Sequence, residues 1–181
     1  MTVLLALLLA ATAGQVLTVE PAESSIRYYV HHKLHDVNAE SRQIEGKAVL
    51  APDGTVMAMF RVPVASFDSG DANRDVNMRE TLEERRYPFV VFKGKTAVPV
   101  PLAAGKTVRA DVDGELDLHG VKRRVTLPID ITLNDAGDAV VKASFHVSLE
   151  AHRIDRPSLL LVKLDDDCRV DLSLRMRPAK D

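Results

Sequence analysis

The sequence predicts an all-β domain of seven or eight antiparallel strands with one short helix. Three observations support this fold class. Residues 106–133 alternate between apolar and polar side chains almost without interruption, further alternating segments lie on both sides of them, and only residues 69–86 clearly break the pattern. The chain contains no tandem repeat and no interdomain linker, so we expect a single domain over residues 14–181.

The clearest alternation predicts two long strands joined by a turn at His119-Gly120. Their apolar side chains share one face: Val108, Ala110, Val112, Leu116, Leu118, Val121, Val125, Leu127, Ile129, Ile131 and Leu133. A period of two is typical of a strand with one dry and one wet face, and a tight turn between two such strands predicts an antiparallel hairpin. Strands of about a dozen residues are long compared with the usual five or six, and long meanders of this kind tend to close into barrels.

Three strand regions precede the helical segment at residues 69–86, and Pro21 interrupts the first of them: residues 15–34, 44–50 and 56–67. Pro52-Asp53-Gly54 predicts a turn, because proline presets one φ angle and glycine tolerates a positive one. Pro63 indicates an edge or a bulge near the end of the third region, because proline cannot donate a hydrogen bond to a neighbouring strand.

Residues 69–86 predict a short surface helix. Asp71 or Asn73 is suited to cap it, and its apolar stripe is narrow. Tyr87-Pro88 ends it, since the residue before a proline is pushed out of the helical region. Residues 98–105 resemble a loop, and three more strands complete the domain: residues 89–92, 139–149 and 169–177.

Residues 1–13 are typical of a secretory signal peptide. The apolar run 3–13 is too short to span a bilayer as a helix, and it ends in the cleavage pattern Ala11-Thr12-Ala13. The alternative is a buried first strand. A signal peptide implies a periplasmic or secreted protein, and we expect no transmembrane span. Cys168 is the only cysteine, so no internal disulfide can form.

The composition argues against nucleic acid as a partner. The formal net charge is -2, charged residues make up 28% of the chain, and no tail of one charge sign is present. Aromatic residues make up only 4% and tryptophan is absent, so a site built on stacking with bases or sugars is not expected.

Ordered segments across the chain carry a resemblance to a known family: Val30 to Val37, Val62 to Gly70, Arg74-Asp75 with Tyr87-Pro88 and Phe92-Lys93, Gly114 to Val125, and Phe145 to Val162 with Arg156-Pro157-Ser158. These segments resemble the YceI-like family of polyisoprenoid-binding, lipocalin-like bacterial domains. The resemblance implies an eight-stranded antiparallel barrel with one short helix after the third strand. It also implies an apolar cavity for a long isoprenoid, a quinone or a fatty-acid-like amphiphile, and no cofactor.

The inward strand faces supply the candidate ligand-binding residues: Phe60, Val62, Leu116, Leu118, Ile129, Ile131, Phe145, Val147, Leu172 and Leu174. An eight-stranded barrel either fills its interior with side chains or holds one small ligand, and the residues alone leave both open. Ala58, Ala110 and Ala143 would leave room, and the resemblance favours a cavity.

His35, Arg74 and Asp75 are the candidates for polar groups that orient a ligand head group at the barrel mouth. For Arg74 and Asp75, together with Asp68 and Asp71, the alternative is a structural cluster that caps the helix and pins it to the barrel.

The histidines and the cysteine do not predict a metal site or a catalytic site. His31 and His35 would lie about 13 Å apart on a strand, too far to share one metal ion. We expect His119 to lie in water at the hairpin tip, where a general base has no partner. Acidic neighbours disfavour a thiolate at Cys168.

The sequence therefore predicts a non-catalytic protein that binds or transports a long-chain isoprenoid or related lipid inside a barrel. The first alternative is a structural or interaction module with a filled barrel. A hydrolase or isomerase acting at the barrel mouth is less favoured, because it needs a base within reach of a nucleophile.

Overall fold

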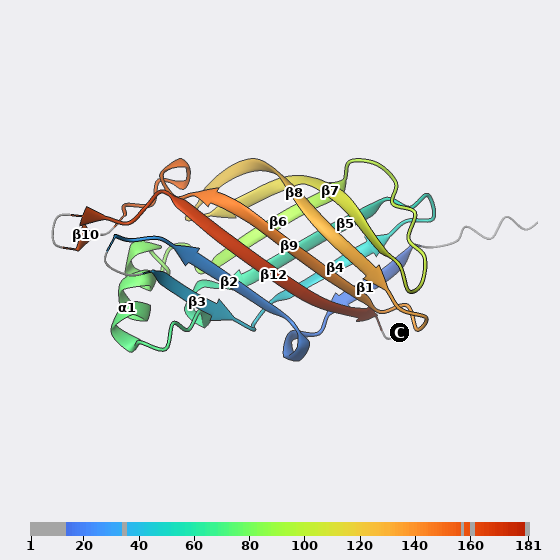
Figure 1. Cartoon of the computed structure of the whole chain (residues 1–181), viewed down its shortest axis with the longest axis horizontal. Coiled ribbons are helices and arrows are strands. Elements are labelled where there is room, and N and C mark those ends of the chain that lie inside the picture. Colours follow the sequence, from blue (N-terminus) through green and yellow to red (C-terminus); the bar gives the residue numbers. More distant parts are fainter. Residues whose placement is uncertain (1–13, 34–35, 157, 160–161, 180–181) are drawn as a thin grey trace, which may run out of the picture.

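The computed structural model describes residues 14–33, 36–156, 158–159 and 162–179. The expected signal peptide, residues 1–13, and the candidate mouth residue His35 lie outside these ranges. Within them, ten strands form one antiparallel sheet in the order β1-β4-β5-β6-β7-β8-β9-β12-β2-β3. The sheet closes because β1 pairs with β12 as well as with β4 (Figure 1).

The helices and strands are bounded as follows: β1 Gln15–Val19, η1 Pro21–Glu23, β2 Ser25–Val30, β3 Val37–Ser41, β4 Glu45–Leu50, β5 Val56–Pro63, η2 Val64–Ser66, α1 Ala72–Thr81, β6 Phe89–Thr96, β7 Thr107–Leu118, β8 Val121–Leu133, β9 Ala139–Ser148, η3 Glu150–His152, β10 Ser158–Leu159, β11 Val162–Lys163 and β12 Asp167–Pro178. The hairpin of β10 and β11 stands apart from the main sheet.

The barrel has eight strands because two of them are built from two pieces each. The 3₁₀ turn η1 at Pro21 separates β1 from β2, and both pieces pair with β12. Their partners β4 and β3 form the second broken strand. The predicted eight-stranded barrel with one helix after its third strand is therefore confirmed. The alternation did not predict β3.

The predicted long hairpin is confirmed, both in its turn at His119-Gly120 and in the pairing of its two strands. The left-handed φ angles of His119 and Gly120, 55° and 69°, build the turn between β7 and β8. Residues of the predicted apolar face stand opposite one another in the register, as Val108 does with Ile131 and Ala110 with Ile129. The hydrophobic pattern thus determined which face of each strand turns inward.

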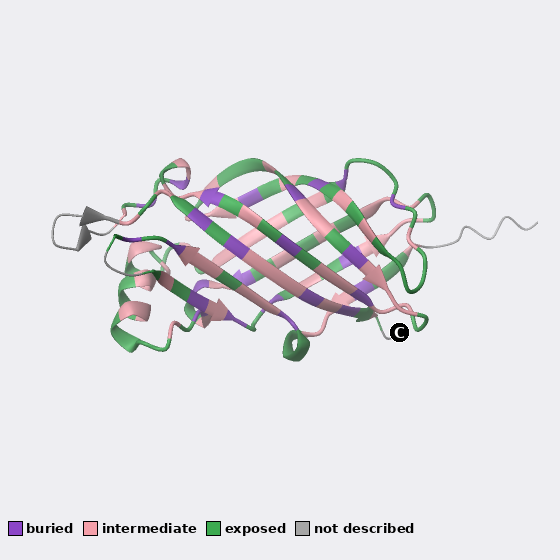
Figure 2. Cartoon of the chain, in the orientation of Figure 1, coloured by how far each residue is buried: buried purple, intermediate pink, exposed green. Residues whose placement is uncertain are grey.

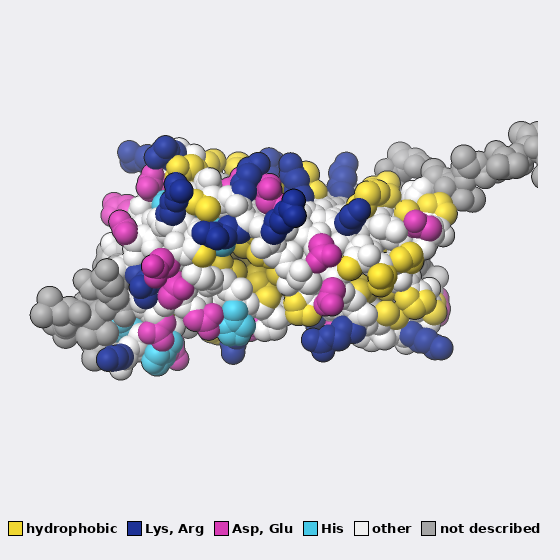
Figure 3. All heavy atoms as spheres, turned by 90° about the horizontal axis from the view of Figure 1, so that it is seen from above, with side chains coloured by type: hydrophobic (Ala, Val, Ile, Leu, Met, Phe, Trp, Pro, Cys, Tyr) yellow, Lys and Arg dark blue, Asp and Glu magenta, His cyan; other side chains and the backbone are white. Residues whose placement is uncertain are grey.

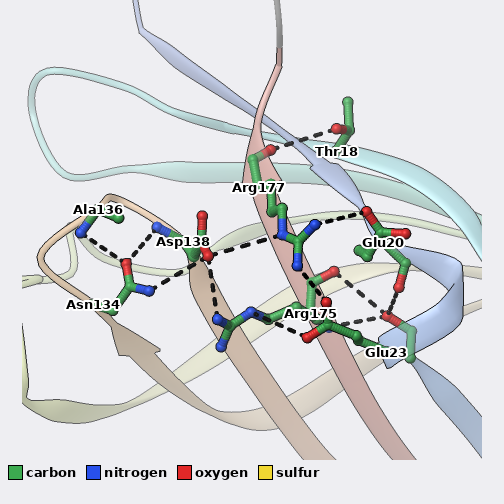
Figure 4. Close-up of polar contacts among 9 residues, drawn as sticks. Thr18, Glu20, Glu23, Asn134, Ala136, Asp138, Arg175 and Arg177 are labelled. Atoms are coloured by element: carbon green, nitrogen blue, oxygen red, sulfur yellow. Dashed lines mark hydrogen bonds and ion pairs between the residues drawn. The ribbon is translucent and has the colours of Figure 1, made fainter.

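The seam where β12 meets β1 and η1 is reinforced by charged side chains (Figure 4). Arg175 contacts Asp138 at 3.2 Å, and Arg177 contacts Glu20 at 3.2 Å and also pairs with Glu23. Asp138 belongs to the turn between β8 and β9, so these ion pairs tie that turn, the final strand and η1 together.

The two ends of the barrel differ. At one end, here called the helix end, lie α1, the His119-Gly120 turn, η3 and the β10–β11 hairpin (Figure 1). At the other, the loop end, lie the connections over residues 51–55, 97–106 and 134–138. No helix in the described part of the chain combines the length and apolar character needed to cross a bilayer.

Buried residues alternate with exposed ones along the barrel strands (Figure 2). Two groups of buried side chains fill the interior. The first cluster is the larger: Leu17, Ala39, Ile44, Ala48, Val62, Phe67, Ala139, Leu174 and Met176. The second cluster comprises Val30, Leu116, Val147, Cys168 and Val170.

Candidate functional site

A cavity of about 70 Å³ lies inside the barrel. Nineteen side chains line it and every one is apolar: Leu17, Ala48, Leu50, Val56, Ala58, Phe60, Phe92, Leu102, Val112, Leu127, Ile129, Ile131, Leu133, Ala139, Val141, Ala143, Leu172, Leu174 and Met176. They come from all eight barrel strands and from the loop after β6. A site of this kind selects a ligand by hydrophobic contact alone, because it offers no polar side chain to bind.

The structure divides the candidate ligand-binding residues into two groups. Phe60, Ile129, Ile131, Leu172 and Leu174 line the cavity. The other five lie in packed parts of the interior: Val62 belongs to the first cluster, and Leu116, Leu118, Phe145 and Val147 belong to the second cluster or pack against it.

Two phenylalanine rings lie side by side in the cavity lining. Phe60 and Phe92 are direct neighbours across β5 and β6 and both line the cavity, while Phe92 also packs against the second cluster. Each ring covers a glycine on a neighbouring strand. A Cβ atom would stand 2.3 Å from the Phe60 ring at Gly46 and 2.7 Å from the Phe92 ring at Gly114. The missing side chains are therefore what allow both rings to lie against the barrel wall.

The cavity approaches the surface at the loop end. Leu50 and Leu102 line both the cavity and an outer groove of about 570 Å³. The groove lies between the start of the described chain, the β4–β5 turn and the loop after β6: Gly14, Gln15, Leu50, Ala51, Pro52, Asp53, Gly54, Val100, Pro101 and Leu102. The cavity and the outer groove therefore adjoin at this end.

Arg74 and Asp75, the described candidates for the mouth, lie on α1 at the helix end. The Oδ1 atom of Asp75 accepts a hydrogen bond from the backbone N–H of Ser69 at 3.0 Å. Asp71 caps the helix by accepting the N–H groups of Asn73 and Arg74, and these bonds hold the pKa of Asp71 below its usual value. These contacts are those of a capped helix, and the structure does not bring Arg74 or Asp75 to the cavity lining.

Tyr28 and Cys168 are ionisable side chains that pack in the barrel interior. Burial raises the pKa of Tyr28 to about 12, and its ring packs against Phe67 at 5.6 Å. Burial, assisted by the charge of Asp167, raises the pKa of Cys168 to about 12. Both groups therefore remain neutral at physiological pH, and the Cys168 thiol is a poor nucleophile.

His31, His119 and His146 are paired with carboxylates. His31 contacts Asp36 at 2.7 Å and His146 contacts Asp167 at 2.8 Å, both on the surface. The expectation that His119 lies in water is wrong: only 9% of its side chain is exposed, because the ring packs edge-on against Tyr87. Its nitrogens contact Glu83 and the backbone oxygen of His152. No group of three or more potential metal ligands occurs among the described residues.

A family model described as the YceI-like domain matches residues 17–176. The chain belongs to the YceI-like family. The match spans every barrel strand, from within β1 to within β12, so the family assignment covers the whole cavity-bearing domain. Among curated proteins, no significant match to the sequence was found.

Solved structures of low sequence identity share the YceI-like barrel. A polyisoprenoid binding domain from Saccharophagus degradans, implicated in plant cell wall breakdown, is 18% identical with a TM-score of 0.76, covering 91% of this chain and 99% of its own. BcnA of Burkholderia cenocepacia is 18% identical with a TM-score of 0.73 and coverages of 87% and 98%. The YceI protein of Campylobacter jejuni is 13% identical with a TM-score of 0.63 and coverages of 83% and 90%.

Several lining residues were not among the sequence candidates. Leu17, Met176, Val141 and Leu127 share the inward parity of their strands, so the alternation could have identified them. The loop residue Leu102 carries no such signal, because it lies in a segment without strand periodicity.

Proposed function

We propose that this chain binds a long-chain isoprenoid or related amphiphilic lipid inside the barrel and releases it unchanged. The observation that carries the proposal is the cavity whose lining is apolar throughout. The relative from Saccharophagus degradans has the same barrel and is described as a polyisoprenoid binding domain, which supports this ligand class. The signal peptide expected at residues 1–13 supports action in the periplasm or outside the cell.

The hydrophobic effect supplies the affinity. Each methylene group transferred from water to a dry interior contributes about 0.8 kcal/mol, so a long tail needs no other strong contact. An isoprenoid tail is a hydrocarbon and forms no hydrogen bonds with polar side chains, and the lining contains no polar side chain.

The cavity volume requires that the lining move when a long tail enters. The cavity measures about 70 Å³, whereas sites for drug-sized ligands occupy about 300–1,000 Å³. Phe92 is the side chain best placed to move, because it lines the cavity and also packs against the second cluster, and Phe60 is its direct neighbour. We infer that a tail displaces these rings and extends the cavity toward the helix end.

The test is lipid content after purification, measured by mass spectrometry, followed by loading with geranylgeraniol. We expect the wild type to carry or take up an apolar molecule and the Ala143→Leu variant to hold markedly less. Ala143 lines the cavity opposite Ile129 and Leu172, so a larger side chain there occupies ligand space.

Lys142→Leu is the matched control, because Lys142 is the neighbouring residue on β9 and is exposed. Circular dichroism and thermal unfolding verify that both variants fold. Equal ligand content in Ala143→Leu and the wild type would contradict binding in this cavity.

The second candidate is an interaction module with a filled barrel, and the small cavity volume favours it. This function predicts that the wild type carries no lipid and takes up no geranylgeraniol, even when the probe is presented in detergent.

We also propose that the chain is not an enzyme. Among the described residues, the imidazoles of His31, His119 and His146 hydrogen-bond carboxylates or backbone oxygens, not a hydroxyl or thiol that they could activate. A ligand recovered chemically unchanged after prolonged incubation with the protein would agree with this, and a new product would contradict it.

A further inference from the structure

The loop between β6 and β7 contains eight consecutive uncharged, apolar residues at the loop end of the barrel, from Ala97 to Ala104. Val98 projects into solvent with 67% of its surface exposed, the largest fraction of any large hydrophobic residue among those described. Val100 is buried, and its N–H donates to the Gly54 oxygen at 2.8 Å. The loop is thus held at its centre while its apolar tip points outward.

An apolar row on the outer barrel surface lies at the same end. Val16, Val49 and Met57 are direct neighbours across β1, β4 and β5, and the row continues to Lys95 on β6, two residues before the loop begins. Met57 is 47% exposed. On the face seen in Figure 3, hydrophobic side chains likewise gather toward the loop end. An exposed apolar surface of this kind is typical of a contact site.

The backbone of the loop has few N–H groups that need hydrogen bonds from water. Pro99 and Pro101 have no N–H group, and the N–H groups of Ala97, Val100 and Leu102 already donate to backbone oxygens. Five of the eight residues therefore present no free donor. Burying an unbonded polar group in an apolar medium is costly, so this loop enters such a medium more cheaply than an ordinary loop.

Lysines border the apolar surface. Lys47, Lys93 and Lys95 are exposed, and none forms an ion pair with a described residue. Their alkyl stems can lie along an apolar surface while the amines reach phosphate groups. Asp113 and Glu115 on β7 face Lys95 and Lys93 across the register and reduce the local positive charge. Apolar contact therefore contributes more to binding at this surface than the charge of the lysines does.

We propose that the loop 97–104 and the adjoining row of Val16, Val49 and Met57 dock the loop end of the barrel onto a phospholipid bilayer. Resting on the proposed function, this places the groove that adjoins the cavity against the medium in which an apolar ligand dissolves. The free backbone donors that a protein partner would use are mostly absent from the loop, whereas hydrocarbon requires none.

The test is co-flotation of the protein, residues 14–181, with vesicles of phosphatidylcholine alone or mixed with phosphatidylglycerol. We expect binding to both, stronger with the anionic lipid and weakened by salt. Val98→Asp should lower the vesicle affinity about tenfold, since it removes one buried aliphatic side chain from the contact. Val76→Asp is the matched control, because Val76 is a 43% exposed valine on α1 at the opposite end.

Absence of wild-type flotation, unchanged binding by Val98→Asp, or equal losses in Val98→Asp and Val76→Asp would each overturn the docking proposal. Loading with geranylgeraniol from detergent separates this proposal from the proposed function. Loading without flotation would overturn docking and leave the binding function intact, whereas flotation without loading would overturn the binding function and support docking. Loading of Val98→Asp from detergent should equal that of the wild type, because Val98 does not line the cavity.

Discussion

Cys168 illustrates how the barrel interior controls the chemistry of a single side chain. The residue is the second of β12 and follows three consecutive aspartates, and the sequence alone predicts an unreactive thiol there. The structure shows a larger cause. Burial in the second cluster raises the pKa of the Cys168 thiol more than the charge of Asp167 does.

We expect the Cys168 thiol to resist alkylation by iodoacetamide at pH 8 in the folded protein and to react rapidly in urea. Its folded-state pKa of about 12 lies above the ordinary cysteine value, so folding is favoured by this group at neutral pH. That contribution is lost as the pH rises from about 8.5 toward 12. Mass spectrometry of the alkylated chain measures the rate. Equal rates with and without urea would contradict the burial.

At the scale of elements, the β7–β8 hairpin depends on its tip. Gly120 combines a positive φ angle with a close neighbour, because a Cβ atom there would stand 2.2 Å from the Tyr87 ring. Tyr87 in turn packs against His119, so the turn and the end of the helical region support each other.

Gly120→Ala should therefore destabilise the protein more than Gly105→Ala does. Gly105 has a similar φ angle of 74° but open space at the Cβ position, so its substitution carries only the backbone strain of about 1–2 kcal/mol. The ring clash at Gly120 adds roughly 1–3 kcal/mol. Urea unfolding of both variants measures the difference, and equal destabilisation would mean that Tyr87 moves aside freely.

At the scale of the whole molecule, closure of the barrel relies on the seam where β12 meets β1. The pairing there covers only three residues of β12, Met176 to Pro178, whereas β12 pairs with β9 over ten. The ion pairs of Arg175 and Arg177 lie beside this short pairing (Figure 4).

Arg175→Met should lower the free energy of unfolding by about 1.5–3 kcal/mol, the range for a partly buried hydrogen bond between charged groups. Asp138, whose side chain is 18% exposed, would lose its closest charged partner and retain the 3.4 Å hydrogen bond from Asn134 and the 4.0 Å contact with Arg177. Arg42→Met is the control, since Arg42 pairs with Glu40 but is 69% exposed and should contribute at most about 1 kcal/mol. Equal losses in the two variants would show that the seam does not depend on this contact.

Local periodicity in the sequence was sufficient to predict much of the barrel. The hairpin, its register, the capped helix and the interruption at Pro21 all follow from patterns within a few residues of one another. The short strand β3 was missed because its five residues, Val37 to Ser41, contain only two apolar side chains, and its pairing with the preceding strand β2 forms the strand.

The amino-acid order thus determined the fold class and the inward face of each strand, because alternation every second residue is a local property of a strand. Which inward residues touch a cavity, and at which end it approaches solvent, depended on packing between residues distant in sequence. The Phe92 ring packs against the second cluster over Gly94 on its own strand and Gly114 on β7, where a side chain would clash with it. Leu102 lines the cavity because its loop folds back toward the β4–β5 turn. A volume of about 70 Å³ is what remains after many side chains have packed together, and no single stretch of sequence specifies it.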